Sequence, residues 1–320
     1  MLSTRSAPDT PVSGSESTLH IGGQAVIEGV MMRSPLYCAV AVLKTSGNTV
    51  LTCDFTPPSG RPSWQQQPFI RGTFNLVDSL RVGTRALFWS AKVAHSEVVS
   101  KSAPLPKVAD VLIGSSMVTG LILAIVLFKI LPQVILEPIK GSFQAPWQVP
   151  IADLCIRIAI FIAYITSITR MPRVRRVFMF HGAEHKVINA YENGVALTLE
   201  NVKLASRIHN RCGTNFVLIV MILSVIASIP VYNLPLYYRL PVQLMMLLPV
   251  AGITYEVIRY VGKFNASSVI QKVLRPLSWL QLLTTRDPDD SMLAVAIESL
   301  QAVVDRHHSH GASEPIHHIS

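Results

Sequence analysis

Four hydrophobic segments follow one another through the middle of the chain. They lie at about 109–131, 151–168, 215–234 and 240–258. An α-helix rises about 1.5 Å per residue, so about 20 apolar residues cross the ~30 Å hydrocarbon core of a membrane. The first and third segments reach this length. The second and fourth are marginal, and they either tilt or enter the membrane without crossing it.

The N-terminal part has a different pattern. β-Branched and alternating residues at 36–44 and 48–55 flank a glycine-containing connection, which predicts a β-hairpin. From about 72 to 95 the apolar residues recur at spacings of three, four and seven, which predicts an amphipathic helix. This helix either lies in the membrane interface or packs on its own protein. Another helix is expected after the acidic residues at 287–290.

These patterns predict a mainly α membrane protein. Its fold is expected to have about four transmembrane helices in two hairpins, with a small N-terminal cytoplasmic part that contains the β-hairpin. The expected parts are a disordered leader at 1–18, an N-terminal cytoplasmic region at 19–108, a membrane domain at 109–258, a C-terminal cytoplasmic segment at 259–304 and a His-rich disordered tail at 305–320. The leader has no apolar stretch of the kind found in a signal peptide.

Composition and charge support the membrane assignment. Half of the 320 residues are hydrophobic and 15% are charged, against about 25% in soluble domains, which excludes a disordered protein. Eight of the basic residues lie in the connection at 170–214. The positive-inside rule therefore places this connection and both termini on the cytoplasmic side of the plasma (inner) membrane.

The arginine run at 170–176 is interpreted as an anchor on anionic lipid. No aromatic platform or nucleic-acid motif accompanies it, so no nucleic acid is expected as a partner. The expected partners are membrane lipids and another membrane protein. The four cysteines form no closely spaced pair, which disfavours a disulfide framework.

The connection at 170–214 carries the most distinctive chemistry. His181 and His185 are four residues apart and share one face of a helix, with Glu184 beside them. This H-x-x-E-H order is the inverted zincin pattern, in which two imidazoles hold zinc and the carboxylate takes a proton from water. His209 and Cys212 could complete a four-ligand set. Four ligands make a closed structural site and three leave an open catalytic position; the spacing leaves both open.

Glu28 is a further candidate. It lies among glycines and apolar residues, where a carboxylate needs a partner or a raised pKa. It is expected to be a metal ligand, a base, or the ion-pair partner of Arg33 or of an arginine in the 170–214 connection. The paired glycines at 22–23 indicate a tight turn or a close backbone approach. Glu256, near the end of the fourth segment, is expected to pair with Arg259.

Six motifs carry a resemblance to a known family. They are GGQAVIEGVMMRSP (22–35), PFIRG (68–72), HGAEHKVINAYENG (181–194), HNRCGTNF (209–216), LLPVAGITYEVIR (247–259) and LQLLTTRDPDD (280–290). In this order, over roughly residues 20–304, they resemble the bacterial DUF1385 family, also called the YqhQ-like family. The resemblance implies a membrane protein that is a predicted metal-dependent enzyme. Its implied site is His181, Glu184, His185, His209, Cys212 and Glu28.

Two functions are consistent with these features. The first is a metal-dependent hydrolase that acts on a lipid-linked or membrane-protein substrate. Glu184 and Glu28 are its candidate catalytic residues, and a divalent metal, zinc, is held by His181, His185, His209 and Cys212. The second is a non-enzymatic membrane-protein chaperone, assembly factor or scaffold, in which the same cluster is a structural clamp. A transporter is disfavoured because the spans lack central ionisable residues and the chain has no evident repeat.

Overall fold

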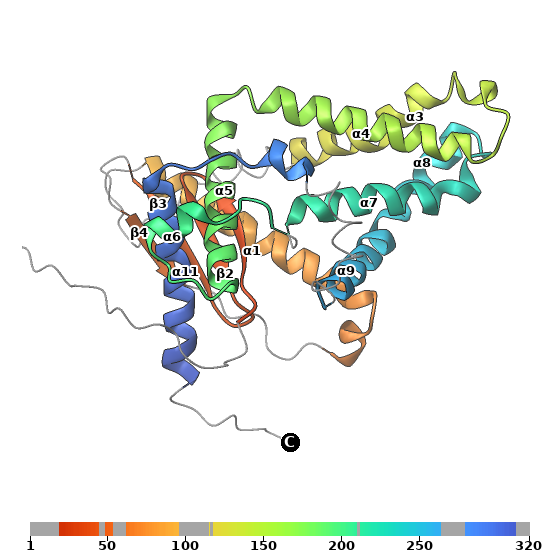
Figure 1. Cartoon of the computed structure of the whole chain (residues 1–320). Coiled ribbons are helices and arrows are strands. Elements are labelled where there is room, and N and C mark those ends of the chain that lie inside the picture. The colour runs from red at the N-terminus through yellow and green to blue at the C-terminus, as the bar shows by residue number, and fades with distance from the viewer. Residues whose placement is uncertain are drawn as a thin grey trace, which may run out of the picture.

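Helices predominate in the protein, and a small sheet lies at the N-terminal end (Figure 1). The computed structural model describes residues 19–44, 49–53, 62–95, 115, 118–209, 212–263 and 279–311. The predicted leader at 1–18 lies outside these residues. The predicted tail begins too early, because helix α11 (Asp290–Gly311) runs past residue 304. Beyond residue 304 the helix contacts the rest of the protein. The His307 ring lies edge-on to the Tyr37 ring, with 6.3 Å between the ring centroids. Residues 312–320 lie outside the described part.

The sheet is antiparallel, and its strands follow chain order. It consists of β1 (Gly22–Val26), β2 (Gly29–Arg33), β3 (Cys38–Leu43) and β4 (Thr49–Cys53). The predicted hairpin is β3–β4 and is confirmed. A second hairpin, β1–β2, extends the sheet and makes β1 an edge strand. The pattern of residues at 22–33 did not predict this hairpin, because glycine has low β-propensity.

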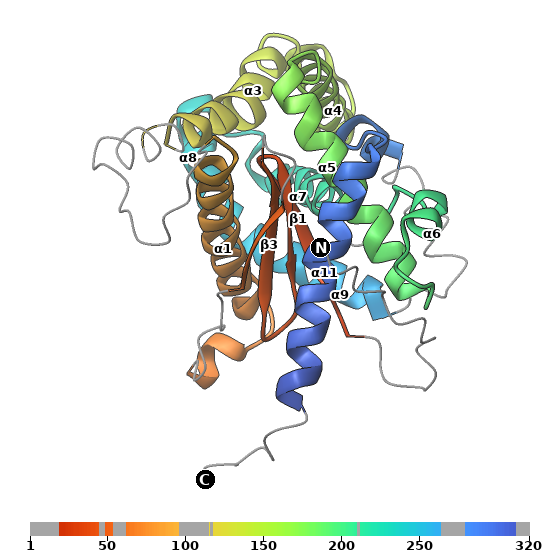
Figure 2. The same ribbon diagram turned by 90° about the vertical axis from the view of Figure 1, so that its left-hand side faces the viewer.

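Helices cover both faces of the sheet. α5 (Pro172–Glu192) and α11 pack on one face, and α1 (Ile70–His95) packs on the other (Figure 2). Successive side chains along a strand point to opposite faces of the sheet. Ile21, just before β1, packs in the hydrophobic core formed with α5, whereas Val26 packs in the core formed with α1. The amphipathic helix expected at 72–95 is thus confirmed, and its C-terminal half packs on its own protein.

The other half of the molecule carries the candidate membrane spans. Three helical stretches are long and apolar enough to cross a membrane: Val118–Leu136, which ends in α3 (Leu131–Leu136), α4 (Gln148–Ile168), and Gly213–Val231, which contains α7 (Gly213–Ser228). The number rises to four if α8 (Leu236–Met245) and α9 (Leu247–Lys263), bent by 44°, count as one span. The expectation of about four spans is confirmed in this sense.

Short elements complete the described chain. They are the 3₁₀ turns η1 (Ser63–Gln66), η3 (Lys140–Ser142) and η4 (Ile229–Val231), the π-helical turn η2 (Val126–Ile130), the helix α6 (Leu199–Leu204) and a helical turn at 279–284.

α1 connects the sheet to α9. The Arg71 guanidinium donates two hydrogen bonds of 2.6 Å to the Glu256 carboxylate. The two helices can approach because glycines lie at the contact: a Cβ on Gly252 would be 2.4 Å from the Phe69 carbonyl oxygen. The predicted pairing of Glu256 with Arg259 is therefore replaced by a pairing with Arg71, since α1 lies directly against α9.

A buried polar network joins the membrane helices, and its two charged members lie in the first half of α4. Arg157 and Asp153, both on α4 and 1% or less exposed, form two hydrogen bonds of 2.9 and 3.0 Å. Asp153 also accepts hydrogen bonds from Gln133 on α3 and from Tyr232, which follows η4. The pattern of neighbouring residues did not predict this network, because Gln133 and Tyr232 lie far from Asp153 in the chain.

This network predicts an asymmetry between single and double variants. Arg157→Met leaves the Asp153 carboxylate buried without its cation, and this costs about 3–5 kcal/mol of unfolding free energy. Asp153→Leu combined with Arg157→Met removes both charges, so its loss should be smaller. Thermal unfolding in detergent, followed by circular dichroism, measures the difference. A double variant less stable than the single variant would contradict the ion pair's role.

Candidate metal centre

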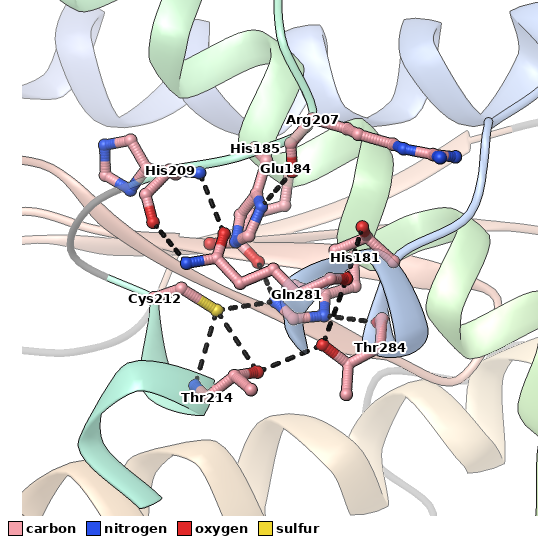
Figure 3. A network of polar contacts seen from close by, with 10 residues as sticks. His181, Glu184, His185, Arg207, His209, Cys212, Thr214, Gln281 and Thr284 are labelled. Atoms are coloured by element: carbon pink, nitrogen blue, oxygen red, sulfur yellow. Dashed lines mark hydrogen bonds and ion pairs between the residues drawn. The ribbon is translucent and has the colours of Figure 1, made fainter. Parts of the chain in front are cut away.

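Three side chains from two segments form the centre. His181 and His185 lie one turn apart on α5, and Cys212 is the N-cap residue of α7. The Cys212 sulfur lies 3.5 Å from Nε2 of His181 and accepts a hydrogen bond from the Thr214 backbone N–H. One ligand atom from each of the three residues lies within 4.8 Å of the others (Figure 3).

Both imidazole rings are held by backbone carbonyls. Nδ1 of His181 lies 2.9 Å from the Thr284 carbonyl oxygen, and Nδ1 of His185 lies 2.6 Å from that of Arg207. A carbonyl only accepts, so each Nδ1 carries the proton and each Nε2 keeps its lone pair. This is the outer-shell arrangement that orients histidine ligands of a metal. With a cysteine thiolate, the donor set suits zinc.

The segment after residue 279 supports the centre. Gln281 accepts a hydrogen bond from the His209 backbone N–H and donates to the His209 carbonyl, each at 2.9 Å. Its amide also donates to Asn215 on α7 at 3.0 Å. A Cβ on Gly182 would lie 2.0 Å from the Arg286 carbonyl oxygen, so this segment lies directly on α5. Sequence reasoning gave Gln281, Thr284 and Gly182 no role, although they lie in the quoted motifs.

Glu184 lies beside the ligands and against the sheet. Its Oε2 is 4.0 Å from Nε2 of His181. Burial raises the pKa of Glu184 above its ordinary value, and the electrostatic influence of the nearby imidazoles of His181 and His209 opposes the shift. A bound divalent cation would likewise favour the carboxylate. A Cβ on Gly23 would be 2.5 Å from Cγ of Glu184, whereas one on Gly22 would meet nothing within 4 Å. The close approach predicted from the glycine pair is found at Gly23.

The remaining two candidates have other partners. Nε2 of His209 lies 3.2 Å from the Glu192 carboxylate, and His209 is not among the three residues that converge. Burial lowers the pKa of His209. Glu28 forms a two-pronged ion pair with Arg176, one of the arginines of the 170–214 connection. The structure therefore brings together His181, His185 and Cys212, with Glu184 adjacent.

A cavity of about 550 Å³ opens at the centre. This volume lies in the range of small-ligand sites, about 300–1,000 Å³. Its walls include the three converging residues, Glu184, the stretch from His20 to Ala25, and the start of α7. The centre is thus reachable from one side.

Comparison with known proteins agrees with these motifs. The sequence model of the family described as "Protein of unknown function (DUF1385)" matches residues 67–306. The chain belongs to the DUF1385 family. It is 31% identical over 296 residues to "Uncharacterized protein YqhQ" of Bacillus subtilis (strain 168), which covers 88% of this chain and 92% of that protein. No solved structure matches the chain. The DUF1385 match includes α5, Cys212 and the segment that holds Gln281.

Metal content tests the centre. We expect His181→Ala/His185→Ala to lose about one equivalent of zinc, because two of three ligands are removed. Inductively coupled plasma mass spectrometry on full-length protein without an affinity tag measures the loss. His307→Ala/His308→Ala is the matched control, since it removes two histidines outside the cluster. Equal metal content in the two double variants would contradict the assignment.

The contact between Gly23 and Glu184 gives a second test. Gly23→Ala places a methyl group where the buried Glu184 side chain lies, and this overpacking should cost about 1–3 kcal/mol. Gly22→Ala, one residue away with open space, should leave the melting temperature unchanged. Thermal unfolding of both variants provides the comparison. Equal melting temperatures would show that β1 does not hold Glu184 in place.

Proposed function

We propose that the protein is a metal-dependent hydrolase that works at the cytoplasmic surface of the inner membrane. The observation that carries the proposal is the convergence of His181, His185 and Cys212 beside Glu184 on an open cavity. Three protein ligands leave a metal position open, as catalytic zinc sites do, whereas structural sites are closed by four.

The residues divide the chemical work among themselves. A bound zinc ion supplies a Lewis acid that makes water nucleophilic near neutral pH. His181, His185 and Cys212 would hold this ion, and the carbonyls of Thr284 and Arg207 fix the two rings. Glu184 takes a proton from the attacking water and delivers it to the leaving group. Its carboxylate lies close enough to the ligand atoms to act there without being one of the three.

The orientation in the membrane is part of the proposal. α4 is a candidate span, and exposed Arg170, Arg173 and Arg175 follow it directly. Basic residues beside a span favour the cytoplasmic side and bind anionic lipid. On this ground we infer that the centre, both termini and the sheet lie on the cytoplasmic side, where a lipid-linked or membrane-protein substrate can reach the cavity.

A structural clamp in a chaperone, assembly factor or scaffold is the alternative. It is favoured by the contacts that connect α5, the start of α7 and the segment near Gln281. These contacts are His181 with Thr284, His181 with Cys212, and Gln281 with Asn215. In that case, replacing Cys212 with serine reduces protein level and capture of a membrane partner together. In the hydrolase, Glu184→Gln keeps both and loses turnover.

Oxygen-18 incorporation tests hydrolysis without knowledge of the substrate. The protein is incubated with detergent-solubilised membranes in water enriched in oxygen-18, and the products are analysed by mass spectrometry. Glu184→Gln should retain metal and lower labelling at least about 100-fold, because it removes the general base. Glu200→Gln is the matched control, because Glu200 is an exposed carboxylate on α6. This variant should incorporate oxygen-18 into products as the wild-type protein does. Undiminished labelling by Glu184→Gln would refute the mechanism.

A further inference from the structure

We infer that the substrate is an extended polypeptide segment that pairs with the outer edge of β1 as an added strand. The inference rests on the proposed hydrolase and names its substrate class. Three observations carry it: an unpaired strand edge, a cavity that follows this edge, and a lining whose composition suits a peptide.

The edge of β1 has free backbone groups at defined positions. A two-residue turn joins β1 to β2, so Val26 and Gly29 form the hydrogen-bonded pair that closes the hairpin. Pairing then alternates, and the N–H and C=O groups of Gly23 and Ala25 point away from β2. Within the described part of the chain, no backbone hydrogen bond reaches these outward groups. Such an edge is a template for another strand.

The cavity follows this edge and meets the metal centre. Its lining includes the stretch from His20 to Ala25 together with the three converging residues and Glu184. In Figure 3 strands of the sheet run behind His181 and Glu184. Because Gly23 contacts Glu184, a strand that pairs with Gly23 and Ala25 passes the carboxylate and the ligand atoms.

The lining favours a peptide over a phosphorylated lipid. Among the described residues that line the cavity there is no lysine or arginine to bind a phosphate. Apolar side chains lie there instead, among them Ile21, Val177, Phe178 and Ile188. In strand addition the backbone gives affinity, and pockets for alternate side chains give specificity. α7, a candidate span, begins at the cavity, so the segment is expected to come from a membrane protein close to its own span.

The reaction is a balanced hydrolysis. The water oxygen forms a bond to the carbonyl carbon of the peptide, and the C–N bond breaks. Glu184 carries one proton from the water to the leaving nitrogen. The new carboxylic acid then gives its remaining proton to the new amine, so the products are a carboxylate and an ammonium group, and nothing is oxidised or reduced.

Hydroxamate probes test the substrate class on the zinc-loaded full-length protein in detergent. The probes are acetohydroxamate, a hydroxamate-capped leucyl-alanyl-alanine amide, and two copies of this peptide N-methylated at one or the other of two successive amides. Isothermal titration measures their affinities. We expect the peptide to bind at least about tenfold tighter than acetohydroxamate. Of the two N-methylated peptides, only one should lose the gain in affinity over acetohydroxamate. Successive amides of a strand point in opposite directions, so only one of the two N–H groups faces β1.

A pair of protein variants locates the effect on β1. Ala25→Pro removes the outward N–H, which an edge strand tolerates, whereas Ala25→Gly keeps it. Both should bind acetohydroxamate as wild type does, and only Ala25→Pro should lose the gain from the peptide. If Ala25→Pro has a lowered melting temperature, the titration of the wild-type protein with the two N-methylated peptides decides whether the peptide pairs as a strand.

The outcomes separate the two proposals. Equal affinity for the peptide and acetohydroxamate, or equal loss with both N-methyl groups, would overturn the peptide inference and leave the hydrolase standing. Absence of acetohydroxamate binding by metal-containing protein would overturn the open catalytic site and both proposals with it. In the oxygen-18 experiment, label at new peptide C-termini supports the inference, and label in lipids alone contradicts it.

Discussion

The orientation of two histidine rings by distant backbone carbonyls is the constraint on which the site depends. His181 and His185 share a helix, but their Nδ1 protons go to Thr284 and Arg207, which lie in segments far apart in the chain. Both segments must pack on α5 before the Nε2 atoms can face Cys212. Gln281 connects the two segments, so the site is correctly formed only when both segments are packed on α5.

Close backbone contacts make this packing possible. Gly182 lets the segment of Arg286 lie on α5, and Gly23 lets β1 lie against Glu184. Each contact leaves no space for a Cβ, so the conformational cost of glycine is accepted where a backbone meets Gly182 and where the Glu184 side chain meets Gly23. The contact between Gly23 and Glu184 also brings the edge strand β1 and the Glu184 carboxyl to the lining of the same cavity.

The membrane half is held by polar contacts of a different kind. Asp153 and Arg157 lie buried between helices, where hydrocarbon packing alone specifies few contacts. The Arg71–Glu256 ion pair then links these helices to α1 and through it to the sheet. Both halves are thus connected through α1, which packs on the face of the sheet opposite α5.

The sequence by itself determined the local features: the apolar segments, the β3–β4 hairpin, the helix at 72–95 and the shared face of His181, Glu184 and His185. Periodicity encodes these because the interacting residues are neighbours in the chain. Only the tertiary structure decided that Cys212 converges on the histidines while His209 turns to Glu192, and that Glu28 pairs with Arg176. It also decided that β1 is an edge strand. These choices depend on which distant segments pack together, and spacing along a chain does not specify that.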